Sequence, residues 1–293
     1  MRFVAILCSL ILLVGLLSGC SPETSCQVAA TTLPVYQFTS ALCEGTGITV
    51  TQLITQQVSC LHDYSLNVSQ VRTLEAAQVV VISGGGLEEF MEDILSNANR
   101  VIDSSQDIEL LECSGHHHQE EHNEAHHHEQ DAHIWLSPAN AKIMVRNIAI
   151  GLAQTFPEHA GRFQVNLERL QLQLQELETY GQNRLKELSC RELVTFHDGF
   201  SYFADAFDLH ILEAIEEEAG REASAQELKH MIGLVREHQL PAVFTEVCGS
   251  VSAADIIAAE TGAEVFSLDM AMSGGDYFEA MYHNIDTVRE AMK

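Results

Sequence analysis

The chain has 293 residues, 46% of them hydrophobic, and its 42 acidic and 15 basic side chains give a formal net charge of −27. This length allows two modest domains or one large one, and the apolar content is enough for ordinary cores, which excludes disorder throughout. The acidic balance excludes nucleic acid as a partner, because binding to phosphates needs a basic surface. An acidic surface attracts cations in general but specifies none of them.

The first twenty residues predict export. Arg2 precedes an apolar run from Phe3 to Leu17, and small residues follow, as in a secretory signal with an apolar core of about fifteen residues. The run is short for a membrane span, which needs about 20 residues. The ending Leu-Ser-Gly-Cys resembles a bacterial lipobox, which implies that residues 1–19 are removed and Cys20 is lipidated. The alternative, an uncleaved anchor helix, leaves the protein on the same side of the membrane.

Six cysteines remain once Cys8 is assigned to the signal and Cys20 to the lipid. They are Cys26, Cys43, Cys60, Cys113, Cys190 and Cys248. An even number in an oxidising compartment suggests disulfides, but the sequence does not fix their pairing. Cys190 with Cys248 is one possibility, since both flank predicted strands in the same half. The chain has no C-x-x-C pair, which argues against a zinc ribbon and against a thioredoxin-like role.

The first half of the chain alternates strand-like and helix-like segments. The predicted order is strand 27–33, helix 35–43, strand 48–54, helix 67–76, strand 78–82 and helix 87–96. Such alternation implies right-handed crossovers and a largely parallel sheet.

The segment 113–131 belongs to no predicted element. It holds seven of the fifteen histidines, namely His116, His117, His118, His122, His126, His127 and His128, interleaved with acidic residues. With almost no apolar side chains it cannot bury a core, so we expect a mobile loop. The run is internal and split, which argues against an expression tag. Imidazoles at this density bind zinc, copper or nickel, so the loop predicts transition-metal binding without selecting the metal.

A long helical stretch follows this loop. Ser137 and Pro138 form a good helix start, with serine as the cap and proline at the first helical position, and Pro157 interrupts the stretch. Apolar residues then recur on one face, at Phe163, Leu167, Leu170, Leu174 and Leu177. This stripe could be a coiled-coil seam, but it covers only about two heptads. We therefore favour a helix packed across two lobes.

The second half repeats the alternation of the first. The predicted order is strand 192–196, helix 224–238, strand 241–245, helix 251–261, strand 264–268 and a final helix from about 276. The fold class is therefore α/β, with two lobes that each contain a mainly parallel sheet flanked by helices, joined by a long backbone helix. We expect a signal peptide at 1–19, an N-terminal lobe at 20–136, a linking helix at 137–188 and a C-terminal lobe at 189–293.

Four side chains outside the loop are candidate metal ligands, because rigid positions suit a tight site. His62 follows the second predicted strand, His133 precedes the helical stretch, and His197 and Asp269 each follow a strand directly. In open α/β sheets, ligands bind beyond the carboxyl ends of the strands, so a cleft between two lobes would gather all four.

Each of these residues also has a plainer interpretation. A lone histidine after a strand is often a hydrogen-bonded structural residue, Asp269 could cap a turn, and Glu246, also at a strand end, competes with Asp269. The remaining histidines, His159, His210, His230, His238 and His283, lie in helical or surface contexts and receive no role.

Taken together, the motifs resemble the metal-binding lipoproteins of bacterial ABC importers, a family with zinc and manganese branches. The matching motifs are His-Asp-Tyr at 62–64, the strand and glycine run at 77–88, Asp-Ala-His-Ile-Trp-Leu-Ser-Pro at 131–138, Thr-Phe-His-Asp-Gly-Phe at 195–200, and Phe-Thr-Glu at 244–246 with Leu-Asp at 268–269. They occur in the family's order and cover essentially the whole mature chain. The chain departs from the usual family pattern at Leu61, Ser65 and Ala132.

The resemblance implies the site and the metal. His62, His133, His197 and Asp269 match the family's four ligand positions, and His197 stands where manganese and iron binders typically carry a carboxylate. Three imidazoles with one carboxylate suit Zn²⁺, whereas manganese prefers more oxygen. A ligating imidazole normally donates its other N–H to a second group, and Asp131, Asp198 and Glu246 are candidates for this support.

The expected function is that of an extracytoplasmic zinc-binding protein that delivers Zn²⁺ to an ABC permease. We expect a monomer held to membrane lipid through Cys20, with no enzymatic activity. The alternatives are a manganese-binding importer protein, a histidine-rich metal sink, and a secreted zinc hydrolase. The hydrolase lacks support, because the chain has no H-E-x-x-H motif and a fourth protein ligand would close the site.

Overall fold

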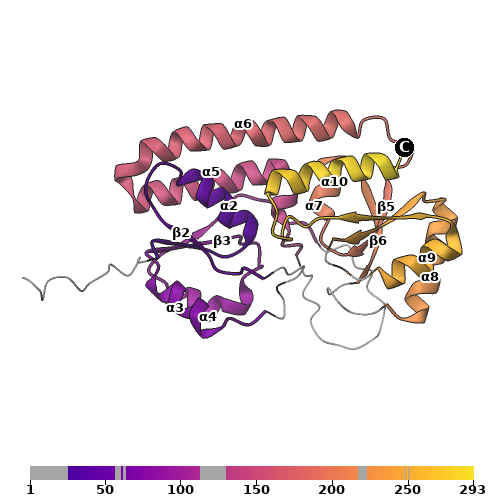
Figure 1. The fold of residues 1–293 in the computed structure, drawn as a ribbon, viewed down its shortest axis with the longest axis horizontal. Coiled ribbons are helices and arrows are strands. Elements are labelled where there is room, and N and C mark those ends of the chain that lie inside the picture. The colour runs from indigo at the N-terminus through magenta and orange to yellow at the C-terminus, as the bar shows by residue number, and fades with distance from the viewer. Residues whose placement is uncertain are drawn as a thin grey trace, which may run out of the picture.

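Two α/β lobes lie side by side beneath one long helix (Figure 1). The computed structural model describes residues 26–56, 61, 64–112, 130–216, 223–247, 249 and 251–293. Each lobe is built on a four-stranded sheet in which the strands pair in parallel. The predicted fold class is therefore confirmed.

The first lobe has the strand order β2-β1-β3-β4. Its elements are β1 (Val28–Ala30), α2 (Leu33–Leu42), β2 (Val50–Gln52), α3 (Val68–Ala76), β3 (Val79–Ile82), η1 (Glu89–Met91), α4 (Glu92–Leu95) and β4 (Val101–Asp103). The central strands β1 and β3 are almost wholly buried, as expected for apolar strands covered on both faces. The predicted helix at 87–96 is a 3₁₀ turn followed by one short α-helix.

The stretch between the lobes is two helices rather than one. After η2 (Ile134–Leu136) come α5 (Pro138–Thr155), η3 (Pro157–His159) and α6 (Ala160–Arg184). Ser137 Oγ caps α5 by accepting from the backbone N–H of Asn140 at 3.4 Å. Pro157 follows the end of α5, where its ring and missing N–H prevent the helix from continuing.

Helix α6 is the element that runs over both lobes (Figure 1). Its predicted apolar face is buried throughout, at Phe163, Leu167, Leu170, Leu174 and Leu177. One side of α6 packs on α5, and it also contacts α2 and α10. The stripe therefore joins the lobes within one chain, as predicted.

The second lobe has the strand order β6-β5-β7-β8. Its elements are β5 (Glu192–His197), α7 (Ser201–Ala206), β6 (His210–Glu216), α8 (Ala225–His238), β7 (Ala242–Glu246), α9 (Ser252–Thr261), β8 (Glu264–Leu268) and α10 (Tyr277–Ala291). A capping box between Ser224 and Glu227 starts α8, at the position predicted from the sequence.

The lobes share a hydrophobic core. One cluster of buried residues extends from β1 and β3 through α5 and α6 to α10, while a smaller cluster lies within the second lobe around α8 and α9. Polar bonds also cross the junction. Trp135 Nε1 donates to the carbonyl of Met270 at 2.8 Å, and the Tyr277 hydroxyl donates to the carbonyl of Trp135 at 2.8 Å.

Within the described part of the chain, Cys26, Cys43 and Cys190 are free thiols. The suggested Cys190–Cys248 disulfide is therefore wrong for this structure. Cys248 itself lies outside the described residues.

No helix among the described residues combines the length and the apolarity that crossing a membrane would require.

Candidate metal centre

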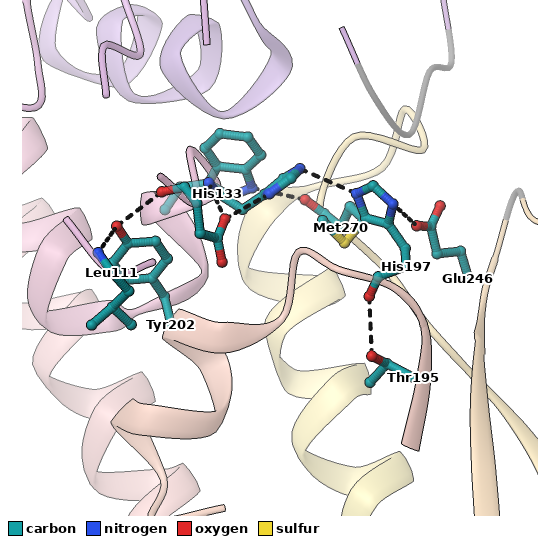
Figure 2. Close-up of polar contacts among 9 residues, drawn as sticks. Leu111, His133, Thr195, His197, Tyr202, Glu246 and Met270 are labelled. Carbon is teal, nitrogen blue, oxygen red and sulfur yellow. Dashed lines mark hydrogen bonds and ion pairs between the residues drawn. The ribbon is translucent and has the colours of Figure 1, made fainter. Parts of the chain in front are cut away.

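Two of the predicted ligands, His133 and His197, meet at the junction of the lobes (Figure 2). His133 lies directly before η2, and His197 is the last residue of β5. Both are buried, their rings are nearly perpendicular, and their Nε2 atoms lie 3.5 Å apart. Two nitrogens held about 2.0–2.1 Å from a tetrahedral zinc ion lie about 3.4 Å apart. The pair is therefore spaced to bind one ion through both Nε2 atoms.

The Asp131 carboxylate holds His133 in place. Its Oδ1 accepts from the backbone N–H of His133 at 2.8 Å and lies 2.8 Å from His133 Nδ1. Since a carboxylate oxygen accepts, Nδ1 carries the proton and Nε2 keeps its lone pair for a metal. Asp131 thus makes the supporting contact that we expected of it.

A second carboxylate, Glu246, faces the other histidine. Glu246 ends β7, the neighbour of β5, and its Oε1 lies 3.5 Å from His197 Nδ1. Both side chains are buried. The order of groups across the junction is therefore carboxylate, imidazole, imidazole, carboxylate, with the two Nε2 atoms facing each other at the centre.

Asp269 directly follows β8, but its carboxylate is used within its own turn. Oδ1 accepts from the backbone N–H of Ala271 at 2.8 Å, and Oδ2 accepts from the hydroxyl of Ser273. Among the described residues, no three His, Cys, Asp or Glu side chains form a group able to hold a metal ion. Asp269 as a ligand therefore stays a prediction, and the structure places it as the cap of a turn.

His62 and the seven histidines of the predicted loop lie outside the described residues, as does Cys20. The residues that flank His62 and Asp63 are described. Leu61 is buried in the core, and the Tyr64 hydroxyl accepts a bond of 2.7 Å from Gln70 Nε2. The complete four-residue ligand set is thus not tested.

Gly199 is a part of the site to which the sequence analysis gave no role. A Cβ atom at this position would lie 2.6 Å from Met270 Cε, 2.7 Å from His197 Cδ2 and 2.9 Å from His133 Cε1. Glycine is therefore required for the two imidazoles to approach each other beside Met270. Only its place in the Phe-His-Asp-Gly motif could have drawn attention to it.

Known proteins resemble this chain over nearly its whole length. The family described as "Zinc-uptake complex component A periplasmic" matches residues 28–291. The crystal structure of a protein named ZnuA superposes with a TM-score of 0.80 at 30% identity, covering 91% of this chain and 99% of that one.

Two relatives from Bacillus subtilis (strain 168) carry different metal names. The high-affinity zinc uptake system protein ZnuA is 28% identical, over 91% of this chain and 87% of its own. The manganese-binding lipoprotein MntA is 25% identical, over 94% of this chain and 95% of its own. The similarity therefore identifies a metal-binding protein without choosing between zinc and manganese.

Proposed function

Because this chain belongs to the zinc-uptake complex component A family, we propose that it captures Zn²⁺ outside the cytoplasm and delivers it to an ABC permease. Members of this family are metal-binding solute-binding components of ABC importers that act outside the cytoplasm, and they are not enzymes. The zinc hydrolase considered from the sequence is thereby excluded.

The observation that carries the choice of zinc is the buried imidazole pair. The two Nε2 atoms lie 3.5 Å apart, close to the nitrogen–nitrogen edge of a tetrahedral zinc site. Imidazole is a borderline ligand that suits zinc, whereas manganese prefers carboxylate, carbonyl and water oxygens in octahedral geometry. Mn²⁺ would need more oxygen ligands than two facing imidazoles supply.

The rest of the proposed path rests on the sequence. The histidines between 116 and 128 gather zinc at low affinity and pass it to His133 and His197. His62 completes the site together with Asp269 or Glu246, and lipid on Cys20 keeps the protein beside its permease.

Calorimetric titration with Zn²⁺ and with Mn²⁺ tests the proposal. We expect one tight zinc site, weak manganese binding, and a loss of at least about tenfold in zinc affinity for His197→Ala, because half of the imidazole pair is removed. His159→Ala is the matched control, since His159 lies in η3 at the start of α6, away from the lobe junction.

Two outcomes would contradict the proposal. Tight manganese binding would assign the protein to the manganese branch. A His197→Ala variant with unchanged zinc affinity would move the site elsewhere, and deletion of residues 116–128 would then identify the segment responsible. A metal sink loses its tight binding in that deletion, whereas a junction site retains one tight zinc ion.

A further inference from the structure

The Tyr202 hydroxyl lies one step from the metal centre. Tyr202 is in the first turn of α7, five residues after His197, and its side chain is buried. The hydroxyl accepts from the backbone N–H of Leu111 at 2.9 Å and donates to the backbone carbonyl of Asp131 at 2.9 Å (Figure 2). It therefore joins two chain segments that are separated by twenty residues of sequence.

These two segments already lie together. The Asp131 N–H donates to the Leu111 carbonyl at 2.8 Å, and Glu112 and Gln130 form an antiparallel bridge. The Tyr202 hydroxyl lies between the Leu111 N–H and the Asp131 carbonyl, so it adds a second connection between these two segments. The backbone of Asp131 is thereby held from Leu111 and from α7.

The same arrangement links the two histidines. Asp131 Oδ1 contacts both the backbone and the ring of His133, so the position of Asp131 fixes the position of this ring. Tyr202 follows His197 in one continuous β5–α7 unit. The Tyr202 hydroxyl therefore connects Asp131, which positions His133, to the β5–α7 unit that contains His197.

We propose that Tyr202 is a positioning residue that sets the separation and orientation of His133 and His197. This inference rests on the proposed function, because it assigns a role at the same metal site. Loss of the hydroxyl removes the bond between the Asp131 carbonyl and α7 and allows the His133 ring to shift relative to His197. The distance between the two Nε2 atoms then departs from the value that suits a tetrahedral ion. The affinity for zinc falls, and the difference between the zinc and manganese affinities becomes smaller.

Tyr202→Phe tests the proposal in the full mature chain, because it keeps the ring and removes only the hydroxyl. We expect zinc affinity to fall by about tenfold, the lower end of what loss of a supporting contact usually costs. Tyr180→Phe is the matched control. The Tyr180 hydroxyl bonds Asp286 at 2.8 Å between α6 and α10, so this variant loses a tyrosine hydrogen bond remote from the site.

A second measurement separates positioning from general stability. Nitrogen-15 spectra of the metal-free protein should show His133 held with its proton on Nδ1 in the wild type and in Tyr180→Phe. In Tyr202→Phe the same signals should show a mixture of the two tautomers, because Asp131 has lost its bond to α7 and its carboxylate holds the His133 ring less firmly.

Unchanged affinity and an unchanged His133 tautomer in Tyr202→Phe would overturn the inference, and so would equal losses of zinc affinity in Tyr202→Phe and Tyr180→Phe. If His197→Ala binds zinc as well as the wild type, the proposed function itself fails. In that case the tautomer spectra still report whether Tyr202 positions His133.

Discussion

The carboxyl group of Glu88 is buried in the first lobe, beside the carboxyl ends of β1 and β3. It accepts three hydrogen bonds, from the Thr31 hydroxyl at 2.6 Å and from the N–H groups of Ser83 at 2.7 Å and Gly84 at 2.9 Å. Burial nevertheless raises the pKa of Glu88 from 4.5 to about 7, against the lowering by these bonds, and the nearby Asp103 charge adds to the rise. The folded protein therefore holds this proton more tightly than the unfolded chain does.

This pKa difference predicts a pH-dependent stability. Because the folded pKa is the higher one, the contribution of Glu88 to stability is complete below pH 4.5 and is lost as the pH rises to about 7. Glu88→Gln cannot ionise. We expect the free energy of unfolding of wild type, relative to this variant, to fall by about 3 kcal/mol between pH 4.5 and 8.

Urea unfolding at several pH values measures this difference, and comparison across pH cancels the hydrogen bond that the glutamine amide loses at every pH. Glu75→Gln is the control, because Glu75 is exposed on α3. A wild-type-minus-variant difference that stays constant from pH 4.5 to 8 would refute the assignment.

At the site, the sequence could predict single residues but not contacts. His133 and His197 could be selected because each lies where a strand ends or a helical stretch begins, and Asp131 could be selected because it lies two residues from His133. Tyr202 could not, since its contact with Asp131 joins residues 71 positions apart. Gly199 is required only because Met270 and both imidazoles surround it in the folded chain.

At the scale of elements, α6 depends on a close approach at Gly181. A Cβ at Gly181 would lie 2.2 Å from Phe207 Cε1 and 2.6 Å from Phe207 Cζ, whereas a Cβ at Gly161, in the first turn of the same helix, would meet nothing within 4 Å. Phe207 is the C-cap residue of α7, so this contact packs α6 against the β5–α7 unit that contains His197 and Tyr202.

The two glycines should respond oppositely to alanine. We expect Gly181→Ala to lower the free energy of unfolding by about 1–3 kcal/mol, because the buried Phe207 ring must move. Gly161→Ala should raise it by up to about 1 kcal/mol, the usual gain of alanine over glycine in a helix. Denaturant unfolding of both variants measures these free energies. Equal effects of the same sign would show that the contact with Phe207 does not require glycine at position 181.

The elements that the sequence did not predict are short or lack a clear boundary residue. β4 has three residues, and α7 has six, too few for a helical period to be visible. The strand β6, which reads His-Ile-Leu-Glu-Ala-Ile-Glu, lacks a clear alternation or a glycine boundary. By contrast, α5, α8 and α10 begin at cap residues that the sequence displays, namely Ser137, Ser224 and Asp276.

For the whole molecule, the shared core predicts cooperative unfolding. Trp135 is the only tryptophan, and it lies buried between the lobes with its indole bonded to Met270. Its fluorescence reports the junction, whereas far-ultraviolet circular dichroism reports the helices of both lobes. We expect the two signals to change at the same urea concentration.

A fluorescence transition at lower urea than the circular dichroism transition would show that the lobes separate before they unfold. A late circular dichroism phase would instead indicate that the smaller cluster around α8 and α9 unfolds independently.

The alternation of strands and helices was sufficient to predict two parallel sheets, because parallel strands need crossover helices. The way the lobes join was harder to predict. The apolar stripe of α6 indicated a spanning helix, but the bonds from Trp135 to Met270 and from Tyr277 to Trp135 connect residues 135 and 142 positions apart. Local patterns contain no information on such pairs.

The bridge between Glu112 and Gln130 has a consequence for the length of the chain that the fold can accept between these two residues. Glu112 and Gln130 lie together, so the two ends of any segment between them are already joined. For a flexible loop closed in this way, doubling the length costs only about 0.6 kcal/mol. The same point is where a reporter domain could be spliced into the chain, because Glu112 and Gln130 would bring both of its ends together close in sequence to His133.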